Sequence, residues 1–356
     1  MSYSFVLTGG GSGGHVFPAL AVARVLRERG HRLLFIGTRH GMESRLVPEA
    51  DFEIEYIRIG ALNRVGIRKQ LRTALQLPLS IAAAWRLLRR FRAQAVFSTG
   101  GYVAGPVMLA AVLARIPLIV MEPNAVPGFA NRRIAGRVHR ALLSFESTRA
   151  WFPAGRSEVT GLPVRAEFFA LRAKQGGTFT LLITGGSQGA RTLNRASRES
   201  WPLFRQNGSP LRLIHQSGPA EQAMLAEEFS TTGIEGEVVP FIGNMAAAFG
   251  EADLVVSRAG AGTFTEIAAA AVPSILVPLP FAADDHQRRN AERLLEAGAA
   301  RMVLDSEMNG PRLFREVEAL RRNPETLADM RGRVRSFARP QAAERAAALL
   351  EEAVKA

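Results

Sequence analysis

The stretch Ala252–Pro280, ADLVVSRAGAGTFTEIAAAAVPSILVPLP, carries the pattern that decides the fold. It predicts a short apolar strand at Leu254–Ser257, a glycine turn, a helix and a second apolar strand. Thr263 and Glu266 have the spacing of a capping box for this helix. A helix that begins on glycines directly after a strand presents unpaired N–H groups and the positive end of its dipole, which favours phosphate. Two roles for Glu266 stay open, capping its own helix or accepting hydrogen bonds from a ribose diol.

The order of strand, glycine loop and helix recurs along the chain. Phe5–Thr8 precedes a glycine loop that ends at His15, Ala95–Ser98 precedes a second such loop, and Phe179–Thr184 precedes a third. Further strands are predicted at Leu33–Gly37, Leu118–Met121, Leu211–His215, Val238–Phe241 and Ser274–Val277, and helices at Val16–Arg29, Val107–Arg115 and Gln341–Val354. The pattern predicts an α/β protein with two doubly wound, Rossmann-like parallel sheets facing each other across a cleft. Ligands are expected at the carboxyl ends of the strands.

Gly161-Leu162-Pro163 marks the expected boundary between two domains. We expect an N-terminal domain at 1–162, a C-terminal domain at 163–338, and a last helix at 339–356 that could pack back on the N-terminal domain. The 356 residues are long enough for two cores of ordinary size.

Composition narrows the class of protein. With 47% hydrophobic and 22% charged residues the chain is globular, and without cysteine it has neither disulfides nor thiolate metal sites. No signal peptide and no apolar run of the ~18 residues that a membrane span needs are visible, so a cytoplasmic protein is expected. The net charge of +13 predicts an anionic partner.

The segment Leu62–Arg92 holds eight basic residues and no acidic one, interleaved with apolar residues. This composition is typical of a surface helix pair that lies on an anionic bilayer, yet the apolar residues could equally face the domain core. Nucleic acid is not expected, since no aromatic stacking platform accompanies the charge. The residues expected to dock on the membrane are Arg68, Lys69, Arg72, Leu75, Leu79, Trp85, Arg86 and Arg89.

Two other motifs have weaker interpretations. Gly9, Gly11 and Gly14 match the dinucleotide pattern G-x-G-x-x-G, but no carboxylate follows the second strand before Glu43, so a nicotinamide-dependent oxidoreductase is only an alternative. Asp284-Asp285-His286 suggests a metal site, but three consecutive residues rarely point at one ion. No metal is therefore expected.

Eight motifs in one order resemble the MurG family of glycosyltransferases. They span both halves of the chain: TGGGSGGHVFPALA (Thr8–Ala21), GGYVAGP (Gly100–Pro106), NAVPGFANR (Asn124–Arg132), GLPVR (Gly161–Arg165), GGSQGA (Gly185–Ala190), HQSG (His215–Gly218), SRAGAGTFTEIA (Ser257–Ala268) and DDHQRRNA (Asp284–Ala291). The chain departs from the usual family pattern at Met121-Glu122-Pro123-Asn124 and at Leu162.

The resemblance implies a GT-B glycosyltransferase that inverts the anomeric centre and needs neither metal nor cofactor. The donor would be UDP-N-acetylglucosamine on the C-terminal domain. The acceptor would be undecaprenyl-pyrophosphoryl-N-acetylmuramoyl-pentapeptide on the N-terminal domain, so that lipid I becomes lipid II in peptidoglycan synthesis. The enzyme would be peripheral on the cytoplasmic face of the inner membrane and would serve cell-wall biogenesis, cell shape and division.

The resemblance also implies roles for individual residues. Glu266 would hold the ribose hydroxyls, and Ile242 would meet uracil through its backbone. Gln287 and Asn290 would read the sugar hydroxyls. The remaining implied contacts are Ser187, Gly262 and Thr263 on the diphosphate, with Asn124, Arg165, Ser12, Gly13 and Gly14 completing the site.

A general base must take the proton of the attacking hydroxyl. His15 suits this task because the ordinary pKa of an imidazole lies near neutrality, and Glu122, at a strand end, is the rival. His15 could instead only hydrogen-bond backbone in its glycine turn, so the choice stays open. A UDP-sugar epimerase, a glycosyltransferase for another lipid acceptor, and a non-enzymatic peripheral membrane protein are further alternatives.

Overall fold

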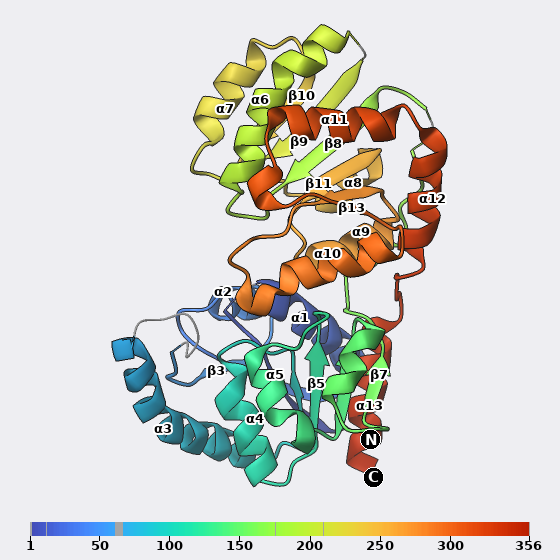
Figure 1. Ribbon diagram of the computed structural model, residues 1–356. Helices are drawn as coiled ribbons and strands as arrows, with labels where there is room; N and C mark the ends of the chain where they lie inside the picture. Colours follow the sequence, from blue (N-terminus) through green and yellow to red (C-terminus); the bar gives the residue numbers. More distant parts are fainter. Residues whose placement is uncertain (1, 12, 61–66, 175, 209, 356) are drawn as a thin grey trace. The chain divides into compact units, whose positions relative to one another are not determined.

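The computed structural model describes residues 2–11, 13–60, 67–174, 176–208 and 210–355, without the side chains of 67–72 and 74. It divides into two compact units (Figure 1). Unit 1 comprises Met1–Val164 and Arg339–Ala356, and unit 2 comprises Arg165–Ala338. Each unit is built on its own parallel sheet.

The sheet of unit 1 has seven strands in the order β3-β2-β1-β4-β5-β6-β7. Their bounds are β1 Ser4–Thr8, β2 Arg32–Gly37, β3 Ile54–Tyr56, β4 Ala95–Ser98, β5 Leu118–Glu122, β6 Arg140–Leu143 and β7 Ser157–Val159. Every pairing is parallel, and the strand order reverses at β1 and β4. Such a reversal leaves a crevice at the carboxyl ends of the two central strands, where ligands bind in folds of this type.

Helices cover both faces of this sheet. They are α1 Gly13–Glu28, α2 Glu43–Glu49, α3 Ile67–Phe91, α4 Ala104–Leu113, α5 Phe129–Ile134 and α13 Ala342–Lys355. Strand residues alternate between faces, so Val6 packs with α3 and α4 in one core cluster while its neighbours Phe5 and Leu7 point to the other face. Both faces are buried, which explains why the strands are continuous apolar runs.

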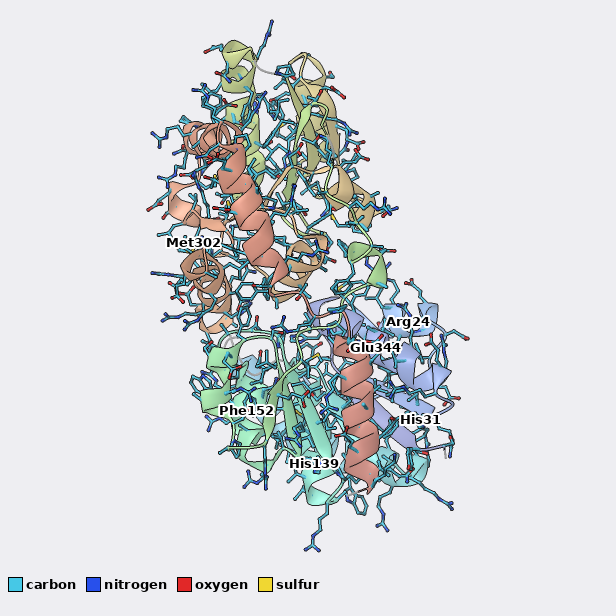
Figure 2. The ribbon with its side chains drawn as sticks, turned by 90° about the vertical axis from the view of Figure 1, so that its right-hand side faces the viewer. Arg24, His31, His139, Phe152, Met302 and Glu344 are labelled. Carbon is cyan, nitrogen blue, oxygen red and sulfur yellow. The ribbon has the colours of Figure 1, made fainter. Side chains whose placement is uncertain are left out.

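The last helix, α13, belongs to unit 1 and packs beside α1. His31 at the entry to β2 lies against it (Figure 2), with Nε2 2.8 Å from the Glu351 carboxylate. Arg345 of α13 makes two hydrogen bonds, of 2.7 and 2.8 Å, to Glu158 of β7. Side-chain contacts thus hold α13 against unit 1 at two places, near β2 and at β7.

The sheet of unit 2 has six parallel strands in the order β10-β9-β8-β11-β12-β13. Their bounds are β8 Phe179–Thr184, β9 Leu211–Gln216, β10 Glu235–Val239, β11 Leu254–Ser257, β12 Ser274–Leu276 and β13 Arg301–Met302. The order reverses at β8 and β11, and these two strands are followed by the glycine loops that begin at Gly185 and Arg258. The predicted fold class, two doubly wound parallel sheets, is confirmed.

Seven helices flank this second sheet in the described part of unit 2. They are α6 Arg191–Asn207, α7 Gln222–Ser230, α8 Met245–Glu251, α9 Ala261–Ala270, α10 His286–Glu296, α11 Gly310–Arg321 and α12 Pro324–Arg335. Trp201 and Phe204 of α6, together with Phe229 of α7, pack on one face of the sheet in a single core cluster.

Two predictions of local structure were wrong. The segment expected to form a helix pair is one 25-residue helix, α3, that continues through Pro78. Its buried residues Ala84 and Leu88 pack on the sheet and hold the second half of the helix in place. The strand expected at Val238–Phe241 lies earlier, at β10, because it pairs with β9 from Glu235 onward.

Candidate active site

In unit 1, His15 lies in the first turn of α1, at the end of the first glycine loop. Its Nδ1 is 2.7 Å from the backbone carbonyl oxygen of Thr99, and the Thr99 hydroxyl donates to the His15 carbonyl oxygen at 2.7 Å. A carbonyl oxygen only accepts, so Nδ1 carries the proton of the neutral ring. This tautomer puts the ring lone pair on Nε2.

Glu122, the last residue of β5, is fully buried and accepts four hydrogen bonds from neutral donors. One carboxylate oxygen accepts from the backbone N–H and the Nδ2 of Asn124, at 3.0 and 3.1 Å. The other accepts from the Gly128 N–H and from Asn131 Nδ2, both at 2.9 Å. Burial raises the pKa of the Glu122 carboxyl above its ordinary value, and these hydrogen bonds act in the opposite direction. The carboxylate organises the loop 123–128.

The predicted residue Asn124 lies in that loop. Its side chain donates to Glu122, and its carbonyl oxygen accepts from Thr148 Oγ1 at 3.1 Å. The loop is therefore held from β5 and from the segment after β6. Of the other predicted residues of unit 1, Gly13 and Gly14 open α1, whereas Ser12 lies outside the described residues.

In unit 2, the loop after β8 carries Ser187 and leads into α6. Ser187 is exposed. The loop is packed against the end of β9: a Cβ on Gly189 would lie 1.8 Å from the Ser217 carbonyl oxygen, and one on Gly218 would lie 2.3 Å from the Gln188 carbonyl oxygen. Both glycines have φ above +70°. The two loops pack backbone against backbone here, so each needs a glycine at the contact.

The predicted capping box of α9 was wrong. The helix begins at Ala261, with Gly260 as N-cap in an extended conformation and no side-chain cap. Thr263 is therefore the third residue of the helix, and Glu266 lies beyond the first turn. The first N–H groups of α9, which include those of Gly262 and Thr263, therefore have no side-chain cap.

The Glu266 carboxylate lies beside a guanidinium. Arg165 is 3.8 Å from Glu266 and 2.9 Å from Glu167, and it lies over the ring of Phe168 at 4.9 Å. Burial raises the pKa of Glu266 to about 7, an effect that Arg165 opposes and Glu167 reinforces. The side chain is still 27% exposed, so a ligand can reach it.

Ile242, the residue expected to meet uracil, already uses its N–H. It donates at 2.9 Å to Oε1 of Gln216, whose Nε2 donates to the Gly186 carbonyl oxygen at 2.8 Å. Gln216 is buried and links the loop after β8 to the segment that contains Ile242. While the Ile242 N–H donates to Gln216, the backbone group of Ile242 that could contact a nucleobase is its carbonyl oxygen.

Gln287 and Asn290 both hold the loop between β11 and α9. Oε1 of Gln287 accepts from the N–H groups of Ala259 and Leu279, at 3.2 and 3.0 Å. Asn290 is fully buried and donates to the Ala259 carbonyl oxygen at 3.3 Å. Their predicted contacts with the sugar stay predictions.

The exposed face of α3 is apolar as well as basic. Leu75 and Leu79 are 79% and 73% exposed, Trp85 is 36% exposed, and Arg86 and Arg89 are exposed. At 100° per residue, positions 75, 79, 86 and 89 share one side of the helix, opposite the buried positions 73, 80, 84 and 88. The helix thus has separate core and exposed faces. Three predicted docking residues have side chains outside the described part: Arg68, Lys69 and Arg72.

No cluster of three or more His, Cys, Asp or Glu side chains suited to a metal ion is found among the residues that the structure describes. His286 Nδ1 lies 2.6 Å from the Ala283 carbonyl oxygen, and Asp284 and Asp285 have positive φ. Within the same described part, no helix is long and apolar enough to cross a membrane.

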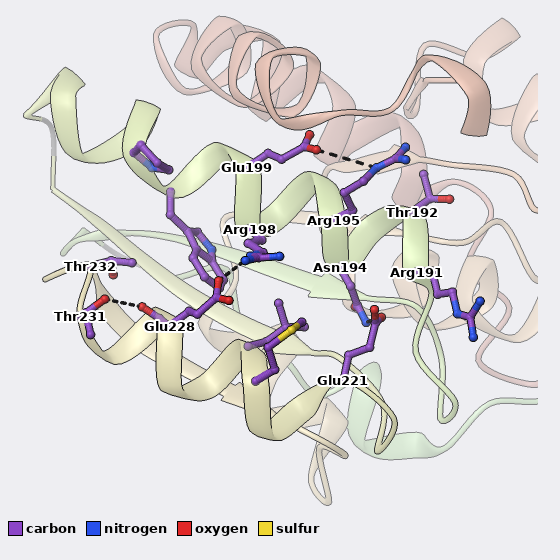
Figure 3. Close-up of a pocket in the computed structure, with 14 residues that line it drawn as sticks. Arg191, Thr192, Asn194, Arg195, Arg198, Glu199, Glu221, Glu228, Thr231 and Thr232 are labelled. Carbon is purple, nitrogen blue, oxygen red and sulfur yellow. Dashed lines mark hydrogen bonds and ion pairs between the residues drawn. The ribbon is translucent and has the colours of Figure 1, made fainter.

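A cavity of about 680 Å³ lies between α6 and α7 (Figure 3). Arg191, Arg195 and Arg198 line it from α6, and Glu221 and Glu228 from the other side. Arg195 and Arg198 already pair with Glu199 and Glu228. None of the predicted site residues lines this cavity.

Sequence reasoning missed a residue pair that joins the two glycine loops of unit 2. Arg258, at the end of β11, pairs with Asp305, and Asp305 accepts from Thr192 Oγ1 in the first turn of α6 at 3.1 Å. Arg258 could have been singled out from the sequence, because a charged residue is unusual inside a glycine turn. Its partner Asp305 could not, because it lies 47 residues further along the chain.

Comparison with known proteins identifies the family. Residues 5–143 match the glycosyltransferase family 28 N-terminal domain, and residues 180–346 match the glycosyltransferase family 28 C-terminal domain. A transferase of Solibacter usitatus is 56% identical over 353 residues, 99% of this chain and 96% of its own. It is named UDP-N-acetylglucosamine–N-acetylmuramyl-(pentapeptide) pyrophosphoryl-undecaprenol N-acetylglucosamine transferase.

Solved structures are similar to this chain over nearly its full length. The crystal structure of Acinetobacter baumannii MurG is similar with a TM-score of 0.83 and 34% identity, covering 99% of this chain and 100% of that one. A Listeria monocytogenes protein described as a UDP-N-acetylglucosamine 2-epimerase has a TM-score of 0.71 and 13% identity, over 99% of this chain and 96% of its own, which shows the fold alone. The epimerase and oxidoreductase alternatives are therefore set aside. The chain belongs to the MurG family of UDP-N-acetylglucosamine-dependent glycosyltransferases.

Proposed function

We propose that this protein transfers N-acetylglucosamine from UDP-N-acetylglucosamine to the 4-hydroxyl of undecaprenyl-pyrophosphoryl-N-acetylmuramoyl-pentapeptide, converting lipid I to lipid II. The observation that carries the proposal is its full-length identity to a transferase named for this reaction. The acceptor oxygen attacks the anomeric carbon, the bond from that carbon to the UDP oxygen breaks, and the hydroxyl proton passes to a base.

The donor half of the site is proposed to lie at the carboxyl ends of β8 and β11. Negative charge develops on the leaving diphosphate, and preorganised N–H groups at helix N-termini can stabilise it without a metal. The Ser187 loop before α6 and the first turn of α9, with Gly262 and Thr263, offer such groups. Arg165, already beside Glu266, would add a full positive charge.

The base is proposed to be His15. Its hydrogen bond to the Thr99 carbonyl oxygen favours the tautomer that accepts a proton on Nε2. Glu122 is the weaker candidate, because four donors already occupy its carboxylate. We assign Glu122 to holding the loop that carries Asn124.

The acceptor's polyprenyl tail stays in the bilayer, so the enzyme must reach it at the membrane surface. We propose that the exposed face of α3 docks there, with Leu75 and Leu79 entering the interface and Arg86 and Arg89 facing anionic lipid. The enzyme would then act as a peripheral protein on the cytoplasmic face.

Transfer of labelled N-acetylglucosamine to a lipid-linked muramoyl acceptor tests the proposed function directly. We expect a labelled lipid product with UDP-N-acetylglucosamine, and competition from UDP but not from other nucleotide sugars at equal concentration. Turnover of the donor to a free epimer, with no lipid product, would contradict the proposal.

Gly262→Ala tests whether the diphosphate approaches the start of α9. A Cβ at this position would meet nothing within 4 Å, so the empty protein should keep or slightly raise its Tm. A bound diphosphate would meet the new methyl group, and we expect the KM for the donor to rise about tenfold, or about 1.4 kcal/mol. Gly332→Ala in α12 is the matched control, since its Cβ is equally free. An unchanged KM in Gly262→Ala would place the diphosphate elsewhere.

The affinity for UDP-N-acetylglucosamine should fall as the pH falls. With the pKa of Glu266 raised to about 7 by burial, its carboxylate is mostly ionised at pH 8 and mostly protonated at pH 6. Only the ionised form accepts two ribose hydroxyls, so Kd measured by calorimetry should rise about tenfold from pH 8 to pH 6, with a proton released on binding. Stability of the empty protein has the opposite sign, because a raised carboxyl pKa contributes stability at low pH that is lost as the pH rises through 7.

Glu266→Gln is the control for this pH dependence. It should bind the donor more weakly at pH 8 and show a flat pH profile. A wild-type slope that persists in Glu266→Gln would assign the titration to another group.

Reversing charges on α3 should weaken membrane binding. Each basic residue near an anionic surface contributes about 1 kcal/mol, so Arg86→Glu with Arg89→Glu should lower partitioning onto anionic vesicles at least about 30-fold. Donor affinity should not change. The double reversal Arg331→Glu with Arg335→Glu on α12 controls for net charge. Equal losses in both double variants would refute docking through α3.

A further inference from the structure

Glu43, the first residue of α2, is a buried carboxylate that the reaction described above does not use. It is 1% exposed. One oxygen accepts from the Gly11 N–H at 2.9 Å, and the other accepts from the N–H and the hydroxyl of Thr38 at 2.9 and 2.8 Å. A single side chain therefore joins the loop after β1 to the loop after β2.

The backbone around Glu43 leaves no room for other side chains. A Cβ on Gly10, Gly37 or Gly41 would lie 2.5, 2.6 and 2.0 Å from atoms of the Glu43 side chain. Among the described residues no ion pair joins Glu43 to a basic side chain. Burying a carboxylate without a counter-charge is unfavourable, so packing alone does not explain a glutamate here.

The loop after β4 packs against the same two loops that Glu43 joins. The Tyr102 hydroxyl lies 3.3 Å from Thr38 Oγ1, and a Cβ on Gly11 would lie 2.9 Å from the Tyr102 ring. A Cβ on Gly101 would lie 2.4 Å from the Gly10 carbonyl oxygen and 3.3 Å from the His15 ring. The loop that leads to His15 is thus held between Glu43 on one side and the loop after β4 on the other.

We propose that Glu43 is a positioning residue for catalysis, which fixes the glycine loop and thereby the placement of His15 toward the acceptor hydroxyl. It acts through the Gly11 N–H and touches no substrate. This inference rests on the proposed role of His15. General-base catalysis depends on hydrogen-bond geometry, so a loop that loses this anchor should lose turnover before it loses donor binding.

The test is Glu43→Gln in the full-length protein, assayed with lipid acceptor and with calorimetry of UDP-N-acetylglucosamine. The amide keeps the volume but turns one accepting oxygen into a donor facing either Gly11 or Thr38. We expect kcat to fall at least about tenfold, with the donor Kd unchanged, since the donor is proposed to bind unit 2. Glu43→Asp, which keeps the charge but retracts the carboxylate, should show the same split if Glu43→Gln fails to fold.

Glu351→Gln is the matched control, because this glutamate also accepts hydrogen bonds in unit 1, from His31 and Arg29, but holds α13. It should lose stability and keep kcat. A folded Glu43 variant with wild-type kcat, or a loss of kcat matched by Glu351→Gln at equal loss of Tm, would overturn the inference. A wild-type protein without transferase activity would instead refute the proposed function.

Discussion

His15→Ala is expected to lower kcat by about 10²- to 10⁴-fold, the range that a positioned general base contributes. The KM for UDP-N-acetylglucosamine should change little, because the donor contacts are proposed in unit 2. The fold should survive, since the hydrogen bond from Nδ1 to the Thr99 carbonyl oxygen is worth only about 1 kcal/mol. Steady-state kinetics with saturating lipid acceptor and a thermal melt measure the two effects separately.

Two further results would identify His15 as the base and not as a structural histidine. The acidic limb of the pH–rate profile should disappear in His15→Ala, and added imidazole should restore part of the turnover. His40→Ala, at an exposed histidine of the same unit, is the control. A His15→Ala enzyme that keeps turnover within about tenfold of wild type would leave proton transfer to another group.

The strands that carry the site were predictable because of how they are buried. Strands β4, β8 and β11 begin and end at the predicted residues, since a parallel strand covered on both faces is a continuous apolar run that stops at its glycine loop. The edge strands β3, β7 and β13 were not predicted. They are two or three residues long and only partly buried, so no apolar run marks them.

The site was less predictable because its hydrogen bonds join distant parts of the chain. Glu43 binds Gly11 across 32 positions, and Gln216 binds Ile242 across 26. A sequence pattern shows which residues follow a strand but not which side chains meet above the sheet. Glu43 was considered only as a carboxylate placed too late to bind a ribose, whereas in the structure it joins two loops.

Glu122→Gln is expected to act mainly on stability, whereas His15→Ala acts mainly on kcat. Replacing one carboxylate oxygen by an amide nitrogen removes the acceptor of two of these four hydrogen bonds, either the pair from Asn124 or those from the Gly128 N–H and Asn131 Nδ2. A buried donor left unpaired costs about 1–3 kcal/mol, but Asn124 is half-buried and Gly128 is exposed, so the free energy of unfolding of unit 1 should fall by about 2 kcal/mol, near the low end for two donors. Chemical denaturation monitored on the full-length protein measures this loss.

The comparison of the two variants decides between the candidate bases. If Glu122 holds the loop 123–128, turnover in Glu122→Gln should fall with the population of the ordered loop, while the acidic limb of the pH–rate profile persists because His15 is still present as the base. Lowering the temperature should then restore much of the activity, as it repopulates the ordered loop. If Glu122 is the base, the variant should instead stay inactive at every temperature at which it is folded, and His15→Ala should retain the acidic limb. The two hypotheses thus predict different results for the activity of Glu122→Gln on cooling and for the acidic limb of His15→Ala. This pair of single substitutions therefore identifies the group that accepts the proton.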